Sequence, residues 1–204
     1  MSSDPTDPQV SPSAPASLGR GAMTRERIVD AAAELFYAQG LRAVSADKII
    51  EKAGITKVTF YRHFPTKDDL IVAYLERRAA WERGAVLGAS EAAHGNADET
   101  LRIVSEGIGN EACTAGFRGC PFINAAAEYA DATHPVRQVV DSHRAWFLAM
   151  LTKLTESVGI TDPAVADELM MLRDGAMVTG YLGNAEKVSA ALLSASRAVM
   201  ALPR

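Results

Sequence analysis

Residues 55–70 read ITKVTFYRHFPTKDDL, a short amphipathic stretch that decides how the N-terminal third of the chain folds. Phe60 and Phe64 are four residues apart, so on a helix both point to one side and pack inward with Ile55. At about 100° per residue, Val58 and Tyr61 point to the opposite side. A helix this short is unstable alone, and an outer face with Val and Tyr predicts that another molecule covers it.

The two segments before this stretch carry the signals of helices that begin and end close together. We expect the first helix to begin at Thr24, its N-cap, and to end at Gly40, a left-handed C-cap. The second begins at Ser45 and ends at Gly54, and Thr56 caps the third helix only two residues later. Short helices joined by a tight turn that holds a glycine predict a helix-turn-helix unit.

Charge is distributed unevenly along the chain, whose formal net charge is −4. Residues 20–83 contain 12 Lys and Arg against 9 Asp and Glu, whereas residues 84–204 contain 9 against 14. A basic surplus confined to the N-terminal third points to a polyanionic partner for that third. The major groove of double-stranded DNA is such a partner, and it admits an α-helix.

Side chains on the outer face of residues 56–63 suit contacts with DNA. We expect Lys57, Val58 and Tyr61 to approach bases, because they can meet guanine, a thymine methyl group and base or phosphate oxygens. Neighbouring cations, hydroxyl groups and peptide N–H groups at helix starts suit the phosphates. The predicted DNA-binding residues are Arg25, Ser45, Thr56, Lys57, Val58, Thr59, Tyr61, Arg62, His63 and Lys67. The alternative is a structural three-helix unit whose surface charges only face water.

Residues 24–75, TRERIVDAAAELFYAQGLRAVSADKIIEKAGITKVTFYRHFPTKDDLIVAYL, resemble the N-terminal domain of the TetR family of bacterial transcription regulators. The resemblance rests on a first helix that ends in LFYAQG and on AGITKVTFYRHFPTKDDL, in which the Tyr, the downstream Phe and the Lys of PTKDDL are in register. It implies the same division between base and backbone contacts. Ala46 and Asp47 depart from the family pattern, which argues against base contacts from the second helix.

The remainder of the chain is predicted to be helical as well. Apolar residues recur at spacings of three and four without the alternation typical of strands, which favours an all-α fold. Residues 1–22, rich in Pro, Ser, Asp and Ala, are expected to form a disordered tail. Residues 23–67 then form the helix-turn-helix DNA-binding domain, and residues 68–204 a helical effector-binding and dimerisation domain. We expect a loop or frayed turn over residues 84–96.

The C-terminal part contains candidate pocket residues. Residues 133–159, THPVRQVVDSHRAWFLAMLTKLTESVG, have the strongest helical periodicity and predict a core helix. Aromatic, thioether and a few polar side chains around it have the mixed character of a small-molecule pocket, although they also suit a packed interior. The candidates are Cys120, Phe122, Asn124, Glu128, His143, Trp146, Phe147, Met150, Met177 and Tyr181. The TetR resemblance implies that this domain binds an effector.

The last two predicted helices are apolar on more than one side. The residues that lie off their main apolar stripes are Met170, Met171, Leu193 and Met200. Such helices need a second surface, which predicts a two-fold, four-helix interface between two copies of the chain. Small residues at Gly175, Ala176 and Gly180 would allow close approach. The TetR resemblance implies the same homodimer.

Several classes of protein lack support in the sequence. There is no GxSxG, phosphate loop or dinucleotide motif, so we expect neither an enzyme nor a resident cofactor. No CxxC, HExxH or paired-histidine spacing indicates a metal site. No apolar run approaches the roughly 18 residues of a membrane span, and no secretory signal opens the chain. The cytoplasm is therefore the expected location.

The favoured interpretation is a repressor that a small-molecule effector releases from a near-palindromic operator, with two alternatives left open. Arg118 lies close to Cys120, and a nearby cation activates thiols, so a redox-sensing regulator that switches through Cys113 or Cys120 is possible. A sequence-tolerant architectural DNA-binding protein would bind with an affinity that varies with salt but hardly with sequence.

Overall fold

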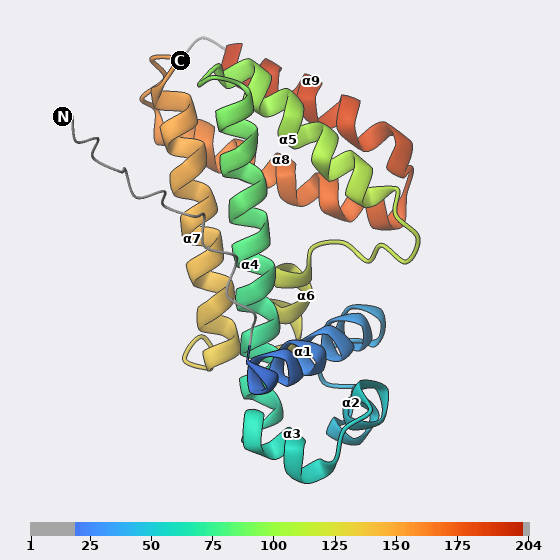
Figure 1. Ribbon diagram of the computed structural model, residues 1–204. Coiled ribbons are helices and arrows are strands. Elements are labelled where there is room, and N and C mark those ends of the chain that lie inside the picture. The colour runs from blue at the N-terminus through green and yellow to red at the C-terminus, as the bar shows by residue number, and fades with distance from the viewer. Residues whose placement is uncertain (1–18, 202–204) are drawn as a thin grey trace, which may run out of the picture.

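The computed structural model describes residues 19–201, and these fold into helices without a strand (Figure 1). The helices are α1 (Arg20–Gln39), α2 (Ala46–Ala53), α3 (Lys57–His63), α4 (Lys67–Ala92), α5 (Ala97–Ala112), α6 (Pro121–Glu128), α7 (Pro135–Glu156), α8 (Pro163–Leu182), the 3₁₀ helix η1 (Ala185–Lys187) and α9 (Val188–Ala201). The predicted all-α fold is confirmed. Helices α1–α3 form one end of the molecule, α5, α8 and α9 the other, and α4 and α7 connect them.

The start of the first helix differs from the prediction. Helix α1 begins at Arg20, and the hydroxyl of Thr24 donates to the carbonyl of Arg20 at 3.0 Å instead of capping the helix. Residues 20–22 are therefore helical rather than part of a tail, and residues 1–18 lie outside the described residues. Gly40 does end α1 with a positive φ of 93°, but its ψ of 155° is not that of the predicted left-handed cap.

The helix starts around the turn follow the prediction. The hydroxyl oxygens of Ser45 and Thr56 accept hydrogen bonds from the N–H groups of Lys48 and Thr59, at 3.3 and 3.2 Å. Gly54 ends α2 in the left-handed conformation, with φ 61° and ψ 44°. Only α2 ends in a left-handed helical glycine among these first three helices, so the tight turn lies where a helix-turn-helix requires it.

The expected loop over residues 84–96 is wrong, because α4 continues to Ala92. It begins with a capping box in which Thr66 and Asp69 bond each other's backbone N–H groups. Gly84 and Gly88 lie in its interior, where glycine costs roughly 1 kcal/mol relative to alanine. Contacts with α5 and α7 on both sides of α4 outweigh this local preference.

One hydrophobic core runs from the N-terminal helices into the C-terminal ones. Its fully buried side chains include Ile28 of α1, Phe60 of α3, Leu70 of α4, Phe122 of α6 and Val140 of α7. Phe60 and Phe64 are both buried, as their spacing predicts. A small second cluster lies between α5, α8 and α9. Because the main core is shared, the orientation of α1–α3 depends on α4 and α6.

Two glycines let α5 pack closely on α8 and α9. A Cβ on Gly180 would lie 2.7 Å from the Cβ of Ala112, and one on Gly109 would lie 2.7 Å from the Cβ of Ser189. Ala176 is also buried in the second cluster. Gly180 and Ala176, predicted to serve the contact between two copies, therefore serve contacts within one chain. A Cβ on Gly175 meets no atom within 4 Å.

Candidate DNA-binding surface and ligand cleft

Helix α3 presents its outer face at the end of the molecule farthest from α8 and α9 (Figure 1). Its inner face holds Phe60, whose ring makes an edge-on contact with the ring of Tyr61 at a centroid distance of 5.2 Å. On the outer face, Val58 is 79% exposed and Tyr61 is 43% exposed. Arg62 is also exposed. The structure therefore gives α3 the inner and outer faces that the spacing predicts, and leaves Val58 and Tyr61 accessible.

The predicted DNA-binding residues Lys57, Arg25 and His63 differ in the neighbours that their side chains contact. Lys57 faces Asp47 of α2, with Nζ 3.4 Å from the carboxylate in an exposed pair that DNA phosphates can replace at little cost. The Arg25 guanidinium lies 5.0 Å from the centre of the Phe64 ring. His63 is half-buried, and its Nε2 has no hydrogen-bond partner within the described residues.

Lys67 is bound within the chain rather than presented to solvent. Its Nζ donates to the carbonyl oxygens of Leu41, Arg42 and Val44 at 3.1, 3.3 and 3.1 Å. An ammonium group has three N–H donors, and these three bonds use all of them. The phosphate contact predicted for Lys67 is therefore replaced by a structural one, which holds the loop between α1 and α2.

Glu128, predicted in the effector pocket, holds the other side of the same loop. Its carboxylate accepts the N–H of Leu41 at 2.9 Å and the N–H of Arg42 at 2.7 Å. A Cβ on Gly40 would lie 3.2 Å from Glu128 Oε1, which explains why a glycine precedes this contact. Residues 41–44, together with Lys67 and Glu128, form what we call the loop clamp. It connects the end of α6 directly to the helix-turn-helix.

Further contacts connect the two ends of α6 to the DNA-binding end. Near the start of α6, Tyr37 Oη donates to the carbonyl of Gly119 at 2.9 Å, and Arg118 bonds the carbonyl of Ala38. After its end, Tyr129 Oη donates to Asp68 at 3.0 Å. Burial and then this bond to Asp68 raise the pKa of Tyr129 to about 12, so its hydroxyl remains a donor. Hydrogen bonds thus join the start of α6 to α1 and the residue after its end to α4.

A cleft of about 580 Å³ opens between α4 and α5, with α7 and α8 at its base. Its apolar wall comes mainly from Ala85, Val86 and Ala89 of α4 and from Ile103, Val104 and Ile108 of α5. Phe147 of α7, Met177 of α8 and Trp81 complete this wall. The charged residues of the lining are Arg78, Glu82, Glu111 and Arg173. The cleft therefore combines a long apolar wall with a cluster of charged groups.

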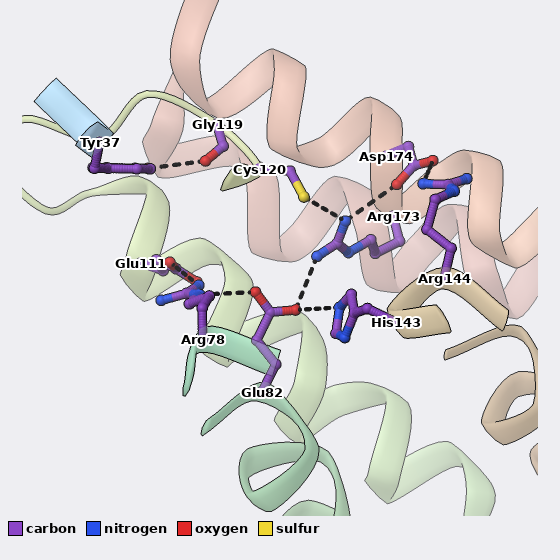
Figure 2. A network of polar contacts seen from close by, with 10 residues as sticks. All are labelled: Tyr37, Arg78, Glu82, Glu111, Gly119, Cys120, His143, Arg144, Arg173 and Asp174. Carbon is purple, nitrogen blue, oxygen red and sulfur yellow. Dashed lines mark hydrogen bonds and ion pairs between the residues drawn. The ribbon is translucent and has the colours of Figure 1, made fainter. Parts of the chain in front are cut away.

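The charged wall is one network centred on the buried Glu82 (Figure 2). Glu82 Oε1 accepts Arg78 Nε at 2.9 Å, and Oε2 accepts His143 Nε2 at 3.0 Å and Arg173 Nη2 at 3.3 Å. Burial by itself raises the pKa of Glu82, but the bond from His143 and the charges of Arg173 and Arg78 lower it overall. Glu82 is therefore held as a carboxylate.

The predicted pocket residues divide into three groups. Phe147 and Met177 line the cleft. Four others support its wall from behind: Cys120 bonds Arg173, His143 bonds Glu82, and Phe122 and Trp146 stack on the His143 ring. Asn124, Glu128 and Tyr181 do not line this cleft, because they line a separate hollow of about 250 Å³ between α1, α6 and α8. Met150 is half-buried and lines neither the cleft nor this hollow.

The sequence prediction missed most of the actual lining. Ala85, Val86 and Ala89 fall in the stretch predicted as a loop, so their inward face was not recognised. Arg78 and Glu82 have the i, i+4 spacing of an ion pair, which was the one available signal. That spacing occurs so often on exposed helices that it does not identify a buried pair.

An exposed stripe runs along α8. Met171, Gly175, Val178 and Leu182 follow one another at spacings of four, three and four, so they share one face, and Met171 and Leu182 are 64% and 75% exposed. Met170, by contrast, is buried within the chain. The stripe is an apolar surface that the described part of the chain leaves uncovered.

Comparison with known proteins identifies the family of the chain. A family model described as bacterial regulatory proteins of the tetR family matches residues 28–74, which covers most of α1 through the first part of α4. The crystal structure of SCO4454, a TetR-family transcriptional regulator from Streptomyces coelicolor, is 42% identical and superposes with a TM-score of 0.83, over 88% of this chain and 95% of that one. The chain belongs to the TetR family.

Two further relatives match over different shares of their length. A TetR regulator structure from Streptomyces avermitilis is 27% identical with a TM-score of 0.73, over 85% of this chain and 98% of that one. The regulator SrpR of Pseudomonas putida is 46% identical over 55 residues, which are 27% of this chain and only 26% of SrpR. The chain thus matches about a quarter of the length of SrpR.

Two general features complete the description of this TetR-family protein. Within residues 19–201, no helix combines the length and the apolar character needed to cross a membrane. The same residues contain no group of three or more His, Cys, Asp or Glu side chains arranged to hold a metal ion.

Proposed function

We propose that this TetR-family regulator is a homodimeric repressor that binds a near-palindromic operator through α3 and leaves it when a small molecule enters the α4–α5 cleft. In this proposal, α1–α3, up to residue 67, read DNA, and residues from 68 onward bind the effector and the second subunit. The observation that carries the proposal is the outer face of α3, where Val58 and Tyr61 are exposed beside Lys57 and Arg62.

The chemistry of this face suits the major groove. Val58 can contact a thymine methyl group, and Lys57 can donate to guanine or to a phosphate once it leaves Asp47. The capped start of α3 supplies peptide N–H groups for a phosphate. Lys67 is not among the contacts, because its donors hold the loop clamp.

The exposed stripe on α8 supports the dimer. Covering Met171, Val178 and Leu182 removes a contiguous apolar surface from water, and Gly175 between them lets a second backbone approach closely. A two-fold arrangement of α8 and α9 from each subunit would hold two α3 helices at a fixed separation. The operator half-sites would then lie about one helical turn or a multiple of it apart.

The contacts around α6 support communication between cleft and DNA-binding end. Arg173 of the cleft wall bonds Cys120 at the start of α6, and Glu128 at its end bonds the loop between α1 and α2. A ligand that packs against Met177, one turn from Arg173 on α8, would shift the Arg173–Cys120 contact and so act on α6 and, through the loop clamp, on the orientation of α3. To release DNA, the ligand must favour the non-binding state by about 1 to 3 kcal/mol or more.

The test begins with an operator selected in vitro from random double-stranded DNA, followed by fluorescence anisotropy. Tyr61→Ala and Lys57→Ala should each weaken operator binding by about 1 to 3 kcal/mol without unfolding the dimer. Lys153→Ala, an exposed Lys on α7, is the matched control and should bind as the wild type does. Wild-type affinity in both α3 variants would refute the assignment of α3 as the reading helix.

One observation favours redox sensing as a second candidate. Arg173 Nη1 lies 3.2 Å from the Sγ of the buried Cys120, so a cation adjoins this sulfur. Attack of the Cys120 thiolate on hydrogen peroxide would form an S–O bond, break the O–O bond and give a sulfenic acid with hydroxide as the leaving group. If peroxide releases the wild type from its operator and Cys120→Ser abolishes the response, this candidate replaces the reversible effector. An unchanged response in Cys120→Ser excludes Cys120 as the switch.

A further inference from the structure

The charged residues that line the α4–α5 cleft are all paired with one another or with groups behind them. Arg78 bonds Glu82 and Glu111, and Arg173 bonds Glu82 and Asp174 (Figure 2). The lining thus contains two guanidinium groups and two carboxylates, which balance in charge. Behind it, Arg144 pairs with Asp174 at 2.8 Å, so the outer end of the network is balanced as well.

The acceptor at the centre of this wall is nearly saturated. Glu82 accepts three bonds, from Arg78, His143 and Arg173, and a carboxylate has room for about four. The hydroxyl of Thr114 donates to the carbonyl of Glu111 at 2.6 Å. The side-chain amide of Asn110, which is uncharged, has no partner in residues 19–201, and the buried Nε of Arg173 has no hydrogen-bond acceptor there either.

We propose that the molecule recognised by this cleft is uncharged and largely apolar, with a neutral hydrogen-bonding group at one end that meets Asn110. The inference rests on the proposed function of the cleft as the effector site. The apolar wall of α4 and α5 takes the body of the ligand, and Phe147 and Met177 form the base against which it packs. The charged network fixes the shape of one end of the cleft without offering a free charge.

A charged ligand has two unfavourable choices in this cleft. A carboxylate or sulfonate meets guanidinium groups that Glu82, Glu111 and Asp174 already neutralise, so it either displaces one of these carboxylates or adds a charge that no cation balances. Otherwise the ligand keeps its charge unpaired against apolar side chains. A cation meets the same problem with the signs reversed. A neutral ligand avoids both penalties, so the cleft discriminates against charge.

The experiment compares probes that share one aromatic body. N-phenyl-1-naphthylamine is neutral, and 8-anilinonaphthalene-1-sulfonate has the same rings with one negative charge. We expect the neutral probe to bind the full-length protein at least about tenfold more tightly, measured by probe fluorescence at several salt concentrations. Neutral diphenylhexatriene should likewise bind more tightly than its trimethylammonium derivative. Equal or tighter binding of either charged probe overturns the inference, as does failure of both neutral probes to bind.

Two variants show whether a probe occupies the cleft. Gly107 of α5 borders the cleft, and a Cβ there would meet no atom within 4 Å, so Gly107→Leu adds a side chain at the cleft whose Cβ does not clash. Gly88→Leu makes the same change on α4 outside the lining. Neutral-probe binding should be lost in Gly107→Leu and kept in Gly88→Leu. If both variants keep it, the probe binds outside the cleft and the inference is overturned.

A neutral probe that binds in the cleft but leaves operator affinity unchanged contradicts the proposed function and not the ligand class.

Discussion

Glu128→Ala tests the loop clamp, the contact that connects α6 to the helix-turn-helix. The substitution removes the acceptor of two short hydrogen bonds, from Leu41 N–H at 2.9 Å and Arg42 N–H at 2.7 Å. A hydrogen bond to a charged group contributes about 1.5 to 3 kcal/mol. Arg42 is exposed and its N–H can turn to water, whereas Leu41 is buried and its N–H is left without an acceptor. We therefore expect a loss of about 2 to 4 kcal/mol in the free energy of unfolding.

Urea denaturation measures this loss, and hydrogen exchange locates it. The amides of Leu41 and Arg42 should exchange faster in Glu128→Ala, while amides in α8 and α9 should be affected only through the change in global stability. Glu91→Ala removes an exposed carboxylate from α4 and is the control, with an expected change within about 0.5 kcal/mol. A change as small as this in Glu128→Ala, with unaltered exchange at Leu41 and Arg42, would refute the clamp.

Three further predictions concern other contacts. Lys67→Met should lower the free energy of unfolding by about 1 to 3 kcal/mol because three carbonyl contacts are lost. The slope of log operator affinity against log salt concentration should stay unchanged. A slope reduced by about one would show that Lys67 does contact a phosphate. Because the folded-state pKa of Glu82 is lowered, its ionisation stabilises the fold above the unfolded-state pKa of about 4.3, and this contribution is lost as the pH falls through the lower folded value. Glu82→Gln should therefore be destabilised by about 3 to 5 kcal/mol at pH 7, with a difference from wild type that shrinks below about pH 4 in urea titrations; a constant difference would contradict this. Gly180→Ala, whose new Cβ would lie 2.7 Å from that of Ala112, should lower the melting temperature, whereas Gly175→Ala should not; equal melting temperatures would contradict the close contact between α5 and α8.

Local patterns predicted the helix-turn-helix correctly. The positions of Phe60 and Phe64, the caps at Ser45 and Thr56 and the turn at Gly54 depend on residues close in sequence, so the sequence alone is sufficient to locate them. The exposed face of α3 follows from the same periodicity. The start of α1 was missed because Gly19 precedes it without a capping side chain.

Contacts between distant residues could not be predicted in the same way. Lys67 and Glu128 are 61 positions apart and hold the same loop from opposite sides, so each was assigned to a site according to its residue type alone. The network around Glu82 joins α4, α7 and α8, and no local pattern distinguishes it from exposed ion pairs. Extension of α4 through Gly84 and Gly88 likewise depends on packing rather than on helix propensity.

The shared core has a consequence for recombination between regulators. Ile28, Phe60, Leu70 and Phe122 belong to one packed interior. A chimaera that joins α1–α3 of this protein to the ligand-binding part of a relative therefore replaces some of these close-packed side chains and keeps others. A productive crossover would carry the residues of α6 that face α1 along with the grafted helices. Engineers who exchange operator specificity to build biosensors should therefore transfer α1–α3 together with the α6 residues that face α1.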